Sequence, residues 1–256
     1  VRELILVAQD PTAYGEDWGR PGAICELLDR LQEIDGIRWV RILYAYPERI
    51  SDEFIAAMVR NTKVVPYLDL PIQHCDDAVL KAMNRRGGRK EIEDAIARLR
   101  AAIPGITLRT TLIAGFPGET EEQYAELCDF VKTVRFDRLG CFAYSAEENT
   151  VAAKMPNQID EETKQRRADH IMELQAEVSA EREGEKVGHT YECICDGVDD
   201  ETGMYLLRTK ADCPEIDGNV LTPADTPLET GAFYKVTITD SDTYDLYGYA
   251  EERLED

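Results

Sequence analysis

The segment from Leu108 to Tyr124 carries the clearest candidate ligand site of the sequence. An apolar strand stops at Gly115, the chain turns through Phe116–Gly118, and Thr120 can cap the helix that follows. In α/β proteins ligands bind where a strand ends and a helix begins. Glycine permits the tight turn and lets backbone amides approach a bound group closely. We predict a ligand-binding turn here, while a β-to-α loop that binds nothing fits this segment alone equally well.

Polar residues also close the other predicted strands and would meet this turn at one edge of a parallel sheet. Two of them lie at the end of the first strand, two follow the third, two lie inside the fourth and one closes the fifth. The predicted site therefore consists of Gln9, Asp10, Gln73, His74, Arg109, Thr111, Gly115 and Tyr144.

Alternative roles remain open for several of these residues. No second histidine lies near His74, so a hydrogen-bonding or stacking role at the rim is favoured over metal ligation. Gln9 and Asp10 either receive an amino or hydroxyl group or cap the next turn. Arg109 points inward from a strand in this interpretation, and an inward guanidinium needs a carboxylate or a ligand.

The elements that would position these residues are parallel βα units, because residues 1–185 alternate between β-rich apolar runs and amphipathic stretches. We predict strands at Leu4–Gln9, Trp39–Tyr44, Val64–Leu70, Leu108–Ala114 and Arg138–Tyr144. Helices are expected near Ile24–Glu33, Asp52–Val59, Asp77–Asn84, Arg89–Ala102 and Glu121–Val134, and a long polar helix at about Asp160–Glu185 should pack outside the sheet. One more strand before Val1 would make a six-stranded, partly open (β/α) barrel.

From His189 the apolar period changes to two. About five short strands separated by Gly and Asp turns predict a small antiparallel barrel of OB-like kind. We therefore predict two domains, a partial (β/α) barrel over 1–185 and the small barrel over 187–256.

The net charge of −22 is concentrated in the second domain. Positions 187–256 contain 17 acidic and 4 basic residues, a net charge of −13, and the other 186 positions carry −9. Such a domain repels a phosphate backbone and favours a basic partner, although a solubilising face explains the charge as well. The exposed acidity also disfavours self-association, so we expect a monomer.

Seven scattered cysteines argue against a disulfide framework and for a reducing compartment. Cys193 and Cys195 share one face of a predicted strand, where buried packing is favoured over metal binding. No apolar run approaches the roughly 20 residues that cross a bilayer. We therefore expect a cytoplasmic protein without a membrane segment.

Three ordered motifs resemble the radical S-adenosylmethionine methylthiotransferases. They are LILVAQDPTAYG at Leu4–Gly15, YLDLPIQHCDDAVLKAMNRRG at Tyr67–Gly87 and RTTLIAGFPGET at Arg109–Thr120. The C-terminal part resembles the TRAM domain of that family, and the wording of the first two motifs is similar to the RimO type. The resemblance covers essentially the whole chain.

This resemblance implies an activity and its cofactors. RimO-type enzymes use S-adenosylmethionine and two 4Fe-4S clusters to add a methylthio group to the β-carbon of an aspartate in a small-subunit ribosomal protein. By motif position, the eight site residues would hold S-adenosylmethionine, and the acidic TRAM domain would meet the basic ribosomal protein.

The cluster ligands of the family are absent from this sequence. The family carries them on a CxxxCxxC loop after the first barrel strand and in an N-terminal domain, and no cysteines here have that spacing. We expect them upstream of Val1, so that this chain alone is inactive and binds no cofactor.

Two other functions stay open. A transfer RNA methylthiotransferase of the MiaB type shares the architecture, and the basic loop at Arg85, Arg86 and Arg89 fits an RNA strand. A non-catalytic module made of a barrel and an OB-like domain is the third hypothesis.

Overall fold

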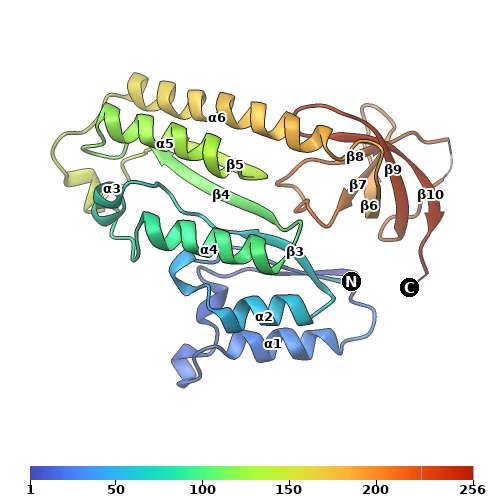
Figure 1. Ribbon diagram of the computed structural model, residues 1–256. Helices are drawn as coiled ribbons and strands as arrows, with labels where there is room; N and C mark the ends of the chain where they lie inside the picture. The colour runs from blue at the N-terminus through green and yellow to red at the C-terminus, as the bar shows by residue number, and fades with distance from the viewer. Residues whose placement is uncertain (226, 256) are drawn as a thin grey trace.

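The larger part of the molecule is a parallel sheet with helices on its outer side (Figure 1). The computed structural model describes residues 1–225 and 227–255. Its sheet has the order β1-β2-β3-β4-β5, with all neighbours parallel. The strands are β1 (Glu3–Leu6), β2 (Trp39–Ile42), β3 (Val64–Asp69), β4 (Thr107–Ala114) and β5 (Arg138–Ala143).

The α-helices begin at residues that can cap them. Ser51, Asp76, Thr120 and Asp160 each accept a hydrogen bond from a backbone N–H in the first turn of the helix that follows. The α-helices are α1 (Ala23–Gln32), α2 (Asp52–Arg60), α3 (Asp77–Ala82), α4 (Arg89–Ala102), α5 (Glu121–Val134) and α6 (Glu161–Gly184), and the short 3-10 helices are η1 (Pro11–Ala13), η2 (Glu16–Trp18), η3 (Pro47–Arg49) and η4 (Ala152–Lys154).

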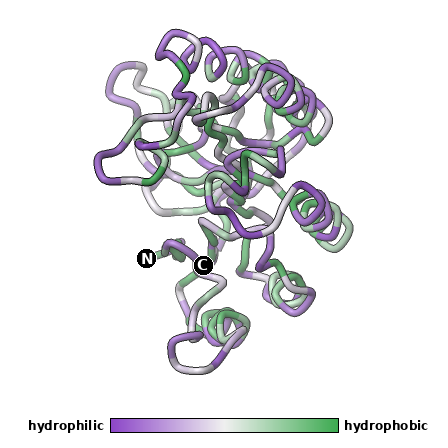
Figure 2. Tube along the Cα trace, turned by 90° about the vertical axis from the view of Figure 1, so that its left-hand side faces the viewer, coloured by the Kyte–Doolittle hydropathy of each residue, from purple (hydrophilic) through white to green (hydrophobic). Residues whose placement is uncertain are grey.

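The two faces of the sheet bury different side chains. Val40 and Ile42 of β2 belong to the main core under the helices, whereas Trp39 and Arg41 face the other way. Figure 2, which looks toward the carboxyl ends of the strands, shows the helices as an arc around one side of a curved sheet. Trp39 and Arg41 therefore lie on the concave face of the sheet, which the helices do not cover.

The second part is a closed barrel with strand order β10-β8-β7-β6-β9. Its strands are β6 (Thr190–Val198), β7 (Tyr205–Thr209), β8 (Val220–Thr222), β9 (Phe233–Ser241) and β10 (Leu246–Arg253). Cys193 and Cys195 are fully buried in its core, as their packing role predicts, and burial raises the pKa of both thiols.

The small barrel sits against the amino ends of the sheet strands, at the right of Figure 1. Trp39, at the start of β2, packs edge-to-face on Phe233 with ring centroids 4.9 Å apart, and both belong to a core that the two parts share. Helix α6 runs along the outside of the sheet from its carboxyl edge to the small barrel (Figure 1).

The predicted fold class is confirmed, and the main differences lie at strand ends. The strand predicted at Leu4–Gln9 ends at Leu6, because its partner β2 ends at Ile42 and leaves Val7–Gln9 exposed. The helices predicted at Arg89–Ala102 and Glu121–Val134 have those bounds.

Candidate functional site

The turn after β4 is closed by a buried carboxylate. Both oxygens of Glu119 accept the N–H of Gly115, at 3.1 and 3.0 Å, and the N–H of Gly118 donates to the carbonyl of Asn157. The turn therefore keeps its shape without a ligand. The glycine amides that the sequence offered to a bound group already have acceptors within the protein.

The carboxylate of Glu119 also contacts the side chains of an arginine and a histidine. Arg167 of α6 donates to it at 2.6 Å, and His74 Nε2 lies 3.4 Å from its other oxygen. The side chains of His74 and Glu119 are fully buried. Nδ1 of His74 accepts the N–H of Asp76, so the other ring nitrogen, Nε2, faces the carboxylate. The expected rim position of His74 is wrong: the imidazole lies beneath the turn.

Position 115 must be glycine because helix α6 packs directly against its backbone. Its φ is +76°, and a Cβ built on it would lie 2.3 Å from Cγ of Lys164. Lys164 is itself buried, with its ammonium 5.5 Å from the centre of the Tyr144 ring. Tyr144 in turn packs edge-to-face on Phe116. Helix α6 thus supports the turn from behind.

Two strands end in strained backbone at the same edge. Tyr44 after β2 and Gln73 after β3 have φ values of 62° and 69°, in the left-handed region that non-glycine residues rarely adopt. Such strain is concentrated at functional sites. Oε1 of Gln73 and the hydroxyl of Tyr144 are buried and have no hydrogen-bond partner among the described residues. Both atoms are therefore available to a ligand at this edge.

Arg109 lies away from this edge, toward the amino end of β4. It donates to Asp69 at 3.0 Å, and its Nε lies 3.7 Å from Asp217 of the small barrel. Burial raises the pKa of Asp69 although Arg109 is beside it. The carboxylate that an inward guanidinium needs is therefore present within the chain.

Gln9 and Asp10 follow β1 at the carboxyl edge. Asp10 accepts the N–H of Thr12 at 3.1 Å and pairs with Arg49 at 2.7 Å, which is the capping role considered from the sequence. Gln9 is exposed, and Thr111 is half-buried on the concave face.

Of the eight predicted residues, the structure gathers His74, Gly115 and Tyr144 around the turn, with Gln73 and Thr111 next to them. Sequence reasoning missed Glu119, Lys164 and Arg167. The position of Glu119 four residues after Gly115 was a usable signal, whereas the two α6 residues resembled an ordinary charged face.

No three metal-ligating side chains converge in the part of the chain that the structure describes. The seven thiols are separate, and six of them are buried. An iron-sulfur cluster therefore does not fit the ligands that these residues provide. At the carboxyl edge, the buried polar atoms of Gln73 and Tyr144 are of the kind that a polar ligand such as S-adenosylmethionine contacts. Among the described helices, none has the length and apolar composition to cross a membrane.

Comparison with known proteins identifies both parts. Residues 1–131 match the family model of the radical SAM superfamily, and residues 187–250 match the TRAM domain. A "Ribosomal protein uS12 methylthiotransferase RimO" of Lachnoclostridium phytofermentans is 46% identical over 251 residues, and one of Desulforamulus reducens is 45% identical over 249. These alignments cover 98% and 97% of this chain but 57% and 56% of the relatives, so the chain spans little more than half their length.

Among solved structures, coproporphyrinogen III oxidase (HemN) of Escherichia coli, a radical SAM enzyme, aligns with a TM-score of 0.56 at 20% identity. That alignment covers 70% of this chain and 41% of the other, and it supports the fold alone. The family models, the relatives and the fold agree: this chain belongs to the radical SAM superfamily, in its RimO-type branch.

Proposed function

We propose that the protein to which this chain belongs adds a methylthio group to the β-carbon of an aspartate in a small-subunit ribosomal protein. The observation that carries the proposal is the 46% identity, over 98% of the chain, to a relative named for this modification of uS12.

The carboxyl edge of the sheet is the proposed S-adenosylmethionine site, and its residues have two kinds of role. Gln73, Thr111, Tyr144 and the exposed Gln9 meet the ligand, since Gln73 and Tyr144 each keep a buried polar atom without a partner among the described residues. His74, Gly115, Asp10 and Arg109 hold the surrounding backbone and side chains through the contacts described above. Bound S-adenosylmethionine would supply the radical initiator and the methyl group.

The iron-sulfur chemistry belongs to cysteines outside the described residues in this proposal. Because residues 1–225 and 227–255 offer no set of three ligands, we propose that this chain alone neither catalyses the reaction nor binds S-adenosylmethionine tightly. Both 4Fe-4S clusters are assigned to the intact protein.

The division of labour follows the proposed domains. Residues 1–185 bind the cofactor, and the acidic residues 187–256 dock the lysine- and arginine-rich ribosomal protein while repelling nucleic acid. In this proposal the protein works as a monomer in the cytoplasm, where ribosomal proteins are made.

The test uses the intact protein with its clusters reconstituted, S-adenosylmethionine, and either uS12 or transfer RNA as substrate. We expect uS12 to gain the mass of one methylthio group on an aspartate, located by fragment mass spectrometry. Modification of transfer RNA instead would establish the MiaB-type alternative, and no modification of either, with intact clusters, would favour a binding module. In parallel, calorimetry of the 256-residue chain with S-adenosylmethionine should detect no tight binding.

A further inference from the structure

A cavity of about 440 Å³ lies where the edge of the sheet, helix α6 and the small barrel meet. The sheet contributes its edge strand β5, and the small barrel contributes two loops, 216–219 and 244–245. The lining residues that matter below are Arg138, Gly140, Met172, Asp217, Tyr244 and Asp245.

The two loops of the small barrel are held in fixed positions. A Cβ built on Gly218 would lie 2.0 Å from the carbonyl oxygen of Tyr244, so only glycine allows the loops to approach this closely. The N–H of Asn219 donates to Asp245 at 2.7 Å, and the carbonyl of Asn219 accepts the N–H of Leu246. The rim of the cavity is therefore formed in advance of any ligand.

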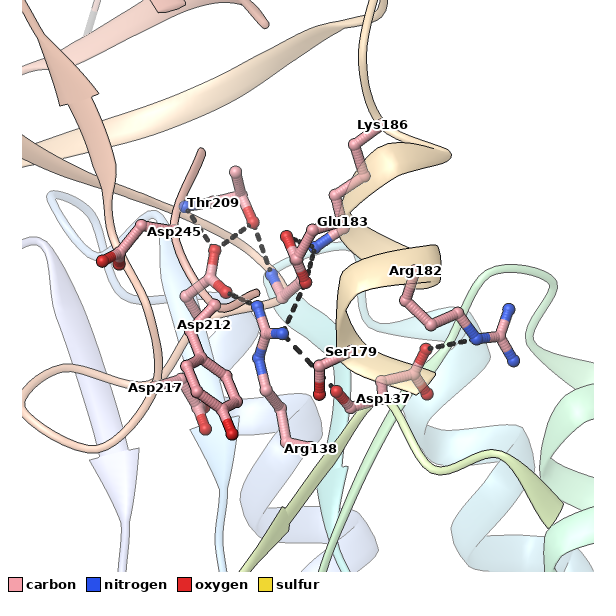
Figure 3. A network of polar contacts seen from close by, with 12 residues as sticks. Asp137, Arg138, Ser179, Arg182, Glu183, Lys186, Thr209, Asp212, Asp217 and Asp245 are labelled. Carbon is pink, nitrogen blue, oxygen red and sulfur yellow. Dashed lines mark hydrogen bonds and ion pairs between the residues drawn. The ribbon is translucent and has the colours of Figure 1, made fainter. Parts of the chain in front are cut away.

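Positive charge in the cavity wall is already neutralised. Arg138 contacts Glu183 of α6 and Asp212 of the small barrel, as the network in Figure 3 shows, and Arg109 is shared by Asp69 and Asp217. Asp245 differs, because its half-buried carboxylate has no cationic partner among residues 1–225 and 227–255. Its charge is therefore available to a cation from outside the chain.

Two further groups fit a peptide that carries such a cation. Tyr244 is 45% exposed beside Asp245, and its ring can stack on the alkyl stem or the charge of a lysine or arginine. Nε of Arg138, whose side chain is more than nine-tenths buried, has no hydrogen-bond partner among the described residues and can donate to a backbone carbonyl.

We propose that this cavity binds a lysine or arginine side chain of the protein substrate, with its charge on Asp245 and its stem against Tyr244. The inference rests on the proposed function, because it names where the basic substrate docks. Strand β5 runs from Gly140 at the cavity to Tyr144 at the carboxyl edge. That interval is about four extended residues, so the cation should lie roughly that many positions from the modified aspartate.

Binding of the 256-residue chain to intact uS12, and to short overlapping peptides of uS12, tests this docking site by fluorescence anisotropy. Asp245→Asn keeps an acceptor for the N–H of Asn219 but removes the charge, and it should weaken binding roughly tenfold. Tyr244→Leu should weaken it roughly threefold, and Tyr244→Phe should not. Asp200→Asn is the matched control, because it removes one exposed charge from the same domain outside the cavity and should change affinity less than about twofold.

Rescue provides a second measurement that does not depend on loss alone. Asp245→Lys should abolish binding of the best wild-type peptide and regain it when the critical lysine of that peptide is replaced by glutamate. Equal losses in Asp245→Asn and Asp200→Asn would overturn the docking site and leave the proposed function standing, since the general acidity would then bind uS12. If the intact enzyme modifies transfer RNA and not uS12, the proposed function itself fails.

Discussion

The two ends of the parallel sheet use buried charge in different ways. At the carboxyl end, Glu119 gathers His74, Arg167 and the N–H of Gly115 from within the larger part. At the amino end, the inward guanidiniums of Arg41, Arg109 and Arg138 meet acceptors in the 210–217 loop of the small barrel. One network shapes a turn beside a site, and the other joins two parts. Burial of a charge alone therefore does not distinguish a functional residue from a structural one.

The acidity of the small barrel consequently has two uses. The side chains of Asp212 and Asp217 are nearly fully buried against the sheet, where they serve assembly rather than recognition. The charge that remains for a partner lies on the exposed turns. The net charge calculated from composition therefore includes both the buried carboxylates and those exposed to a partner.

Breaking the amino-end network should have the largest effect. Arg138→Met leaves the buried carboxylate of Asp212 without its ion-pair partner and leaves Glu183 with Lys186 alone, and we expect a loss of about 3–5 kcal/mol of unfolding free energy in urea denaturation. Arg98→Met is the control, because Arg98 pairs with Asp52 and Asp94 on an exposed surface and should cost less than about 1 kcal/mol. Similar losses in both variants would contradict the comparison.

Disturbing the carboxyl-end turn should come next. Gly115→Ala combines a left-handed backbone with an overlap on Lys164, and we expect a loss of about 3 kcal/mol. Gly118→Ala has a similar φ of +84° but no neighbour within 4 Å of the added Cβ, so only the backbone cost of about 1 kcal/mol remains. Thermal denaturation of both variants separates the cost of the left-handed backbone from the cost of the overlap on Lys164. Equal shifts would show that Lys164 moves aside.

Acid pH should separate two carboxyl groups of the amino-end network. Burial alone would raise the pKa of Asp212, but Arg138 and Lys186 hold it below its ordinary value. Its folded pKa is lower than its unfolded pKa, so its stabilisation is present above about pH 4 and is lost as the pH falls further. The pKa of Asp217 is raised, chiefly by burial, so its contribution has the opposite sign and declines as the pH rises above about 4.

Urea denaturation between acid and neutral pH measures this difference. Asp212→Asn should flatten the loss of stability toward acid, whereas Asp217→Asn should leave that loss in place. A parallel shift of the whole curve in Asp212→Asn would mean that this group does not titrate differently on folding.

The smallest effect is expected at an exposed pair of the small barrel. Nζ of Lys235 and Oε2 of Glu252 lie 2.7 Å apart across β9 and β10, with at least half of each side chain exposed to solvent. Replacing both by glutamine should leave the melting temperature unchanged within error, since exposed ion pairs are screened and disordered. A clear drop would indicate that surface charge stabilises this domain more than its buried pairs suggest.

Periodicity and capping were enough to predict most elements. Thr120 was predicted to cap the helix that follows the turn, and α5 begins directly after it. The turn at Gly115 was also predictable, but its reason was not, because Lys164 lies 49 positions further along the chain. His74 was placed at the rim because a strand end points there, yet the left-handed residue Gln73 before it turns the imidazole inward.

The ion-pair partners of buried charged side chains could not be predicted from the sequence. Arg109 needed a carboxylate or a ligand, and Asp69 and Asp217 come from distant positions on either side of it. Local patterns carry no information about such pairs. The same limit applies to the cavity at Asp245, which exists only because two loops of the small barrel meet the edge of the sheet.

Helix α6 connects the turn after β4 to the small barrel. Its 24 residues span about 36 Å, and it is pinned near its start by Lys164 and Arg167 and near its end by Glu183. Sliding or rolling this rod would break buried contacts at both ends at once. One continuous helix thus connects the small barrel to the turn at Gly115, and buried contacts hold it at both ends.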